Sequence, residues 1–377
     1  MKKTYIAIAS LLLCANLMAQ TPAHRTAQTV TADVLAQMPA ETQQKYNQLI
    51  NDLKGTGEEG VLALVKMINA PGKGSNAQVD YALSGLTHYV MAKGEESARE
   101  TIAKAYGKAL GQVSERETKA FIIRQLQICG GDESVALLLE YANDQELSGP
   151  AVRALASIGT KEAAQGLVGA LKNRMGSPET KLHIVRALAD FEEAEGAEPV
   201  LLGLREGADE KMQKEINYAL SQLGSSASLK VLAEAAAKAN YVMENTGANE
   251  AYIMLIKRLA AKGDTKTAQK AAADLMKKAT KANQVHSREA ALEILLSVQP
   301  ATTQKQILAT LKDPCKAYRN AALNFASDYA EATLYVELLK AMDKAKDAVK
   351  VDLTATEPAK KEAAETQRET ETNDACK

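Results

Sequence analysis

The sequence predicts an all-α fold in which antiparallel helix pairs stack one after another as an α-solenoid. A short apolar segment closed by glycine, clearest at residues 151–159, recurs along the chain. Its leucine anchors are spaced by about 30 to 40 residues, which is typical of helical solenoids. No window alternates polar and apolar residues for long enough to predict a strand. The anchors are Leu126, Leu155, Leu188, Leu220 and Leu259.

The first residues, 1–19, are predicted to be a cleaved secretory signal. Two lysines precede an apolar run at residues 6–13, which is too short to span a bilayer core of about 30 Å. Cys14 would suggest a lipoprotein, but it follows Leu13, where lipid attachment favours a small residue. We therefore expect export to the periplasm or the outer surface, with no lipid anchor and no transmembrane segment.

Residues 20–39 are polar and are predicted to be an irregular N-terminal segment. Helix pairs follow, joined by short turns with glycine, which readily takes the left-handed conformation beyond a helix end. Val61, Leu64, Val65 and Ile68 form the apolar stripe of one such helix. The helices expected as far as residue 158 are 40–54, 58–69, 76–93, 98–110, 115–128, 133–142 and 150–158.

The same organisation is expected for the rest of a repeat domain that covers residues 40–353, with about nine pairs in all. Prolines 178 and 314 mark helix starts, because proline fits the first helical turn. The tail, residues 354–377, is rich in Glu, Lys and Thr and is predicted to be disordered. The later helices expected are 160–171, 179–191, 198–204, 209–223, 226–238, 249–261, 265–278, 287–298, 302–311, 318–330 and 332–342.

Composition limits the possible partners. The formal net charge of −1 would become −3 after loss of Lys2 and Lys3 with the signal, so we expect no general attraction to nucleic acid. The chain has no tryptophan and three phenylalanines, which predicts a core of aliphatic side chains. The cysteines beyond the signal are odd in number and far apart in sequence, and we expect free thiols. They are Cys129, Cys315 and Cys376.

A resemblance to HEAT repeats of the short bacterial type is clearest in residues 151–171, Ala-Val-Arg-Ala-Leu-Ala-Ser-Ile-Gly-Thr-Lys-Glu-Ala-Ala-Gln-Gly-Leu-Val-Gly-Ala-Leu. It extends with varying quality from Glu58 to Met342. The resemblance implies an armadillo-type fold, a right-handed superhelix whose second helices line the concave face, and a role in binding other macromolecules.

The chain as a whole also resembles the N-terminal HEAT region of large secreted Bacteroidetes proteins. The later part of those proteins is a sandwich domain of the 3-keto-disaccharide hydrolase type, which this sequence does not show. No glycosidase activity is therefore expected. The alternative interpretation is a truncated accessory region of a larger secreted carbohydrate-processing enzyme. Val336, Leu338 and Leu339 are not followed by the polar capping repeat that usually closes a solenoid, which favours that alternative or a covering partner.

The sequence indicates no catalytic, metal or cofactor site. Its histidines, at positions 24, 88, 183 and 286, fall in different repeats and lack the spacing of metal ligands. Two glycine-rich turns, at 55–57 and 72–74, lack the Gly-Lys-Ser/Thr ending of a phosphate-binding loop. We expect a non-catalytic scaffold. A HEAT-like lyase is the rival class, and it would need convergent catalytic side chains in one groove.

One set of residues is predicted to form a binding site. Registering the repeats on their closing glycine places five side chains, which we call the ladder, two residues before the anchor leucine. On the concave face they would follow the groove. Because arginine pairs with carboxylates in a bidentate manner, we expect a protein partner with an acidic segment, or an anionic glycan. A solvated helix face is the alternative. The ladder residues are Arg124, Arg153, Arg186, Tyr218 and Lys257.

Overall fold

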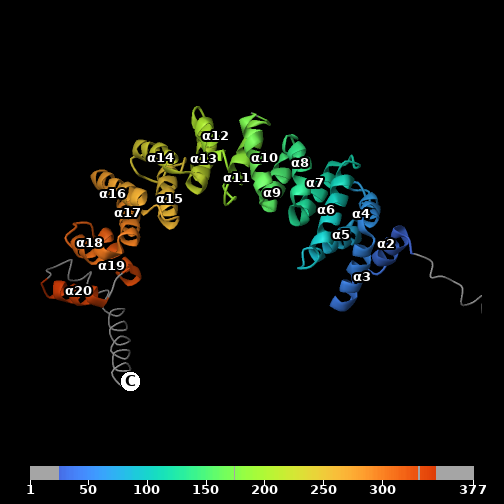
Figure 1. Ribbon diagram of the computed structural model, residues 1–377, viewed down its shortest axis with the longest axis horizontal. Coiled ribbons are helices and arrows are strands. Elements are labelled where there is room, and N and C mark those ends of the chain that lie inside the picture. The colour runs from blue at the N-terminus through green and yellow to red at the C-terminus, as the bar shows by residue number, and fades with distance from the viewer. Residues whose placement is uncertain (1–24, 174, 330–331, 345–377) are drawn as a thin grey trace, which may run out of the picture. The chain divides into compact units, whose positions relative to one another are not determined.

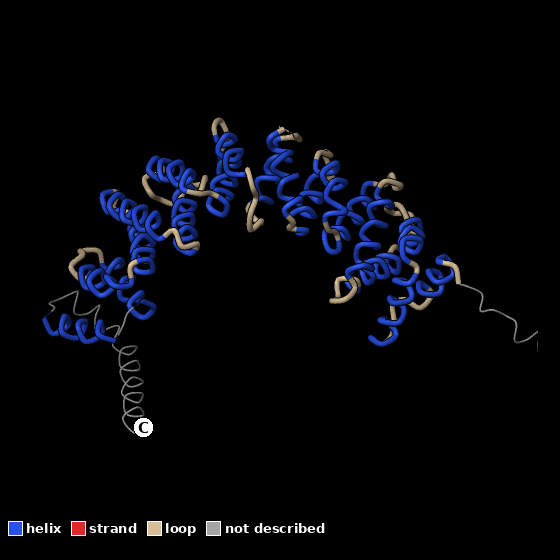
Figure 2. The backbone as a smooth tube through the Cα atoms, viewed as in Figure 1, coloured by secondary structure: helices blue, strands red, loops and turns tan. Residues whose placement is uncertain are grey.

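The computed structural model describes residues 25–173, 175–329 and 332–344. All regular elements in these ranges are helices, as Figures 1 and 2 show, so the predicted all-α class is confirmed there. The predicted signal, the tail and Cys376 lie outside the described residues. The chain divides into two units, Met1–His183 and Ile184–Lys377, and the boundary falls within α11 (Pro178–Leu188).

In the first unit, helices pack mainly against neighbours in the chain. The helices α4, α6, α8 and α10 form one succession of contacts, and α5, α7 and α9 form a second. Contacts such as α6 with α7 and α8 with α9 join the two successions. The bounds are α2 Ala27–Leu35, α3 Gln43–Gly55, α4 Gly57–Lys66, α5 Ala77–Tyr89, α6 Glu96–Leu110, α7 Arg116–Cys129, α8 Asp132–Ala142, α9 Ser148–Ile158 and α10 Lys161–Lys172.

The second unit repeats this organisation. The helices α13, α15, α17 and α19 contact one another in turn, and each also packs on the helix that precedes it. We call α5, α7, α9, α11, α13, α15, α17 and α19 the second helices. The bounds are α12 Ala197–Arg205, α13 Glu210–Leu223, α14 Ser226–Lys238, α15 Ala248–Ala261, α16 Thr265–Lys281, α17 Val285–Val298, a 3₁₀ turn Pro300–Thr302, α18 Thr303–Thr310, α19 Lys316–Tyr329 and α20 Ala332–Lys344.

Local sequence signals explain many helix boundaries. The Thr160 hydroxyl accepts a hydrogen bond from the Ala163 amide at 3.3 Å, and the Asp209 carboxylate accepts one from the Met212 amide at 2.8 Å. Such caps satisfy amides that have no partner within the helix. Gly159 ends α9 in the left-handed conformation, with a φ of 67°, and its amide donates to the Leu155 carbonyl. The backbone therefore favours glycine at position 159. Gly130 and Gly224, which close α7 and α13, instead have φ values of −66° and −65°.

The core consists of small and aliphatic side chains from successive helices. The anchors Leu126, Leu155, Leu188 and Leu220 are fully buried, and Leu259 is 8% exposed. Burial of such side chains stabilises the fold by about 25 cal/mol per Å² of apolar surface. The free thiol of Cys129 lies in this core, and burial raises its pKa to about 12. Cys315 is also a free thiol and is partly exposed.

The prediction that residues 20–39 are irregular is wrong for Ala27–Leu35, which form α2. Val30 and Val34 are buried, and α2 packs against α3 and α4. The Thr26 hydroxyl caps the helix by accepting from the Thr29 amide at 3.2 Å. Thr29 and Thr31 give this segment a weak intrinsic helix propensity. Tertiary packing of the two valines outweighs that propensity, which a local reading of the sequence does not show.

The last described helix is partly covered on its apolar side. Leu338 is fully buried, whereas Val336 and Leu339 are 51% and 43% exposed. The sequence predicts that no capping repeat covers these three side chains, and two of them are accessible to solvent in α20.

Candidate binding surface on the second helices

The five ladder residues are exposed on second helices. Both sequence neighbours are buried for four of them, while Lys257 lies between the buried Ile256 and the partly buried Arg258. Arg153, for example, is exposed on α9, while Ala151, Val152, Ala154 and Leu155 are buried. This register places the ladder position on the solvent side of each helix. The structure places Arg124 and Arg153 in the first unit and Arg186, Tyr218 and Lys257 in the second.

In the first unit, the two ladder arginines remain available for an anion. The Arg124 guanidinium lies 5.9 Å from the centre of the Phe121 ring and lines a pocket of 140 Å³ with residues of α5 and α7. Burial raises the pKa of Asp80 in this pocket, and the Arg124 charge partly opposes the rise. Within the described part of the chain, no carboxylate lies within ion-pair distance of Arg124 or Arg153.

In the second unit, the ladder cations are neutralised by carboxylates of the next second helix. Arg186 makes a bidentate contact with Glu215 of α13, with Nε–Oε2 and Nη2–Oε1 distances of 3.2 and 2.5 Å. Lys257 Nζ lies 2.7 Å from Glu293 Oε2 of α17. Glu293 is partly exposed and lies between the buried Leu292 and Ile294. These pairs leave little positive charge for an anionic partner at this face of the second unit.

A pocket of 480 Å³ lies between α13 and α15 and is bordered by the loop that joins α14 to α15, residues 239–247. Its apolar lining includes Tyr218 from α13, Met254 from α15 and Met243 from the loop. These side chains are 43%, 37% and 78% exposed. A group of large apolar side chains exposed together on a protein surface commonly marks an interaction site.

Asn217 holds the loop in place from inside the helix layer. Its side chain is fully buried; Nδ2 donates to the Thr246 carbonyl at 2.9 Å, and Oδ1 accepts from Arg205 Nε at 2.8 Å. On the other side of the loop, Ser287 Oγ donates to the Tyr241 carbonyl at 2.9 Å. The loop is therefore tied directly to α13 and α17, and Arg205 of α12 holds the Asn217 side chain that makes the first of these ties.

The loop also caps the helix that follows it. Glu244 Oε2 accepts from the Thr246 amide at 2.7 Å, and Oε1 accepts from the Ala248 amide at 3.0 Å. Burial tends to raise the pKa of Glu244, but these hydrogen bonds outweigh it and lower the pKa. Asn240 and Tyr241 adopt left-handed conformations, with φ values of 52° and 57°. Tyrosine rarely takes this conformation, and the surrounding contacts hold it there.

Sequence reasoning found Tyr218 but missed the rest of this pocket. At the position before the ladder residue, other repeats have Ile123, Val152, Val185 and Ile256, whereas α13 has Asn217. A polar residue in this apolar register, followed by a connection of nine residues before α15, could have drawn attention to the site. Met243 lines the same pocket as Met254 only because of the loop conformation, which was not accessible from the sequence.

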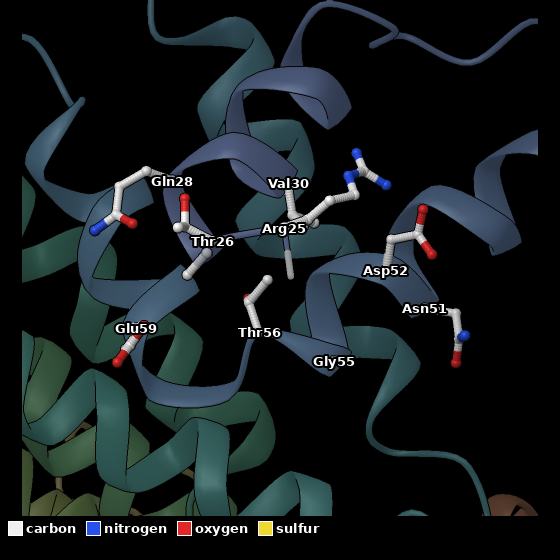
Figure 3. A pocket seen from close by; sticks show the side chains of 10 residues that line it. Arg25, Thr26, Gln28, Val30, Asn51, Asp52, Gly55, Thr56 and Glu59 are labelled. Carbon is white, nitrogen blue, oxygen red and sulfur yellow. The ribbon is translucent and has the colours of Figure 1, made fainter. Parts of the chain in front are cut away.

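A second, more polar cavity of 660 Å³ lies between the start of α2 and the α3–α4 junction. Figure 3 shows Thr26, Arg25 and Thr56 in the middle of the view, with Glu59 on one side and Asp52 on the other. Its lining residues include no large exposed apolar side chain. It adjoins Arg25, the first described residue, and we therefore assign no ligand to it.

The described ranges contain no group of three or more His, Cys, Asp or Glu side chains that could hold a metal ion, and none of their helices has the length and apolar character needed to cross a membrane. No protein-family model matches the chain, and no curated protein matches it.

Proposed function

We propose that this chain is an exported, HEAT-like, non-catalytic scaffold that binds another protein through the exposed faces of its second helices. The observation that carries the proposal is the α13–α15 pocket, where Tyr218, Met243 and Met254 are exposed beside a tied loop. Aromatic and methionine side chains are common in the centres of protein interfaces. A loop fixed before binding also reduces the ordering entropy that association costs.

The neighbour-to-neighbour packing within each unit supports a repeat architecture. Pockets lie between consecutive second helices, between α5 and α7 in the first unit and between α13 and α15 or α15 and α17 in the second. A ladder residue lines each of them. Within the second unit alone, two such pockets offer separate contacts to an extended partner.

Affinity capture with the full chain tests this function. We expect the unaltered protein, recovered from the periplasm with a mass short of residues 1–19, to retain a discrete set of proteins. Replacement of Tyr218 and Met254 by serine is expected to reduce their capture at least about fivefold, because it removes the exposed apolar anchors.

The matched control replaces Lys230 and Glu234 by serine. Both residues are exposed on α14, and neither lines the pocket. This control should capture the partners as well as the unaltered protein. The proposal would be contradicted if the Tyr218 and Met254 variant captured the partners as well as the unaltered protein does. It would also be contradicted if the unaltered protein captured no specific partner.

A further inference from the structure

The charges around the α13–α15 pocket define the chemistry of what it can bind. Three carboxylates line it, Glu215, Glu244 and Glu250, against one lysine, Lys214. Glu215 is paired with Arg186, and the Arg205 charge helps to lower the pKa of Glu244, so Glu250 is the carboxylate left to attract a cation. The pocket therefore favours a positively charged partner group, whereas the ladder alone predicts a negatively charged one.

The three carboxylates differ in how they are used. Glu215 is paired with Arg186, and both oxygens of Glu244 accept hydrogen bonds at the start of α15. Glu250 is different: its Oε2 atom is buried and has no hydrogen-bond partner among the described residues. A buried carboxylate oxygen without a partner is costly, and a donor from a bound molecule would satisfy it once the Glu250 carboxylate turns toward the pocket.

The apolar walls favour a cation of a particular shape. Tyr218 presents an exposed ring, and Met254 lies on the neighbouring helix. A guanidinium stacks on aromatic faces and carries a long apolar stem, while its planar donors match a carboxylate. Met243, at the mouth, offers a flexible apolar surface for a neighbouring side chain.

We propose that the α13–α15 pocket binds an arginine side chain of an extended protein segment, with the guanidinium against Glu250 and the stem against Tyr218 and Met254. An apolar residue next to this arginine packs on Met243. This inference rests on the proposed scaffold function and names the partner chemistry at the same site. The bound segment adds a donor to Glu250 and covers the exposed apolar side chains.

Fluorescence anisotropy with defined peptides tests the inference on the full chain. The probe is a fluorescein-labelled peptide with the sequence Gly-Leu-Arg-Leu-Gly; matched peptides carry citrulline or glutamate in place of arginine. Citrulline keeps the shape and removes the charge. We expect the arginine peptide to bind at least about tenfold more tightly than the citrulline peptide and the glutamate peptide to bind most weakly.

Variants assign the preference to the pocket. Glu250→Gln keeps the side-chain size, and we expect it to abolish most of the tenfold preference for arginine. Met254→Ser should weaken the arginine and citrulline peptides alike, because it removes apolar contact and no charge. Glu234→Gln on α14 is the matched charge control and should leave all affinities unchanged. Circular dichroism of each variant confirms that it remains folded.

Two results would overturn the inference: equal binding of the arginine and citrulline peptides, or an unchanged arginine preference in Glu250→Gln. Partner capture that depends on Tyr218 and Met254 would then still support the scaffold function with another partner chemistry. Failure of the capture experiment itself would instead count against the scaffold function.

Discussion

Replacing Asn217 by alanine is expected to lower the free energy of unfolding of the second unit by about 3 kcal/mol. The substitution leaves the partly buried Arg205 Nε and the Thr246 carbonyl without their partners, and each orphaned group costs roughly 1–3 kcal/mol. The tie between α13 and the 239–247 loop is lost as well. The amides of this loop should then exchange with solvent faster than in the unaltered protein.

Urea denaturation and hydrogen exchange together measure this prediction. Val185→Ala, at the equivalent position of α11, is the matched control: it removes apolar volume and leaves Asn217 in place. We expect the control to destabilise the protein without faster exchange in residues 239–247. Unchanged loop exchange in Asn217→Ala would show that Asn217 does not hold the loop.

The second large effect is expected at Glu198, which joins α12 to the start of α14. Its Oε1 accepts from the amides of Ser225 and Ser228 at 2.7 and 3.1 Å, and the two serine hydroxyls also donate to the carboxylate. Glu198→Gln removes the charge that strengthens these bonds. Because the side chain is partly exposed, we expect a loss of only about 1–2 kcal/mol at neutral pH.

This loss should depend on pH with a defined sign. Burial tends to raise the pKa of Glu198, but the serine hydrogen bonds outweigh it and lower the pKa below its ordinary value of 4.5. A lowered pKa in the folded state gives stability above pH 4.5, which is lost as the pH falls through the folded value. The stability difference between the unaltered protein and Glu198→Gln should therefore shrink below pH 4.5.

Chemical denaturation at pH 7 and at several values below pH 4.5 provides the measurement. Glu234→Gln, whose side chain is exposed on α14, is the charge-matched control and should show no such convergence. A difference that stays constant over this range would contradict the role assigned to the carboxylate.

The fold class and helix order were predictable because apolar periodicity and closing glycines act within each helix. Leu155 and Gly159 illustrate this, since one fills the core and the other ends α9 in a left-handed turn. The helix Ala27–Leu35 was missed because packing of Val30 and Val34 stabilises it more than its own propensity does.

The candidate site was predictable in register but not in charge. The sequence placed Arg186 and Lys257 on exposed faces, and they are exposed. Their partners Glu215 and Glu293 lie 29 and 36 residues away and reach them only through packing of adjacent helices. The Asn217 contact with the Thr246 carbonyl likewise depends on a loop with two left-handed residues. Long-range contacts of this kind decide what the surface can bind.

Site-specific photocrosslinking tests most directly whether partners dock at the α13–α15 pocket. A photoreactive phenylalanine analogue is placed at position 218, 243 or 254, or on α14 at position 230 or 234. We predict that all three pocket positions form a covalent adduct with the same partner in cells, and that the two α14 positions form none. Adducts of equal yield from α14, or no adduct from the pocket positions, would contradict the account.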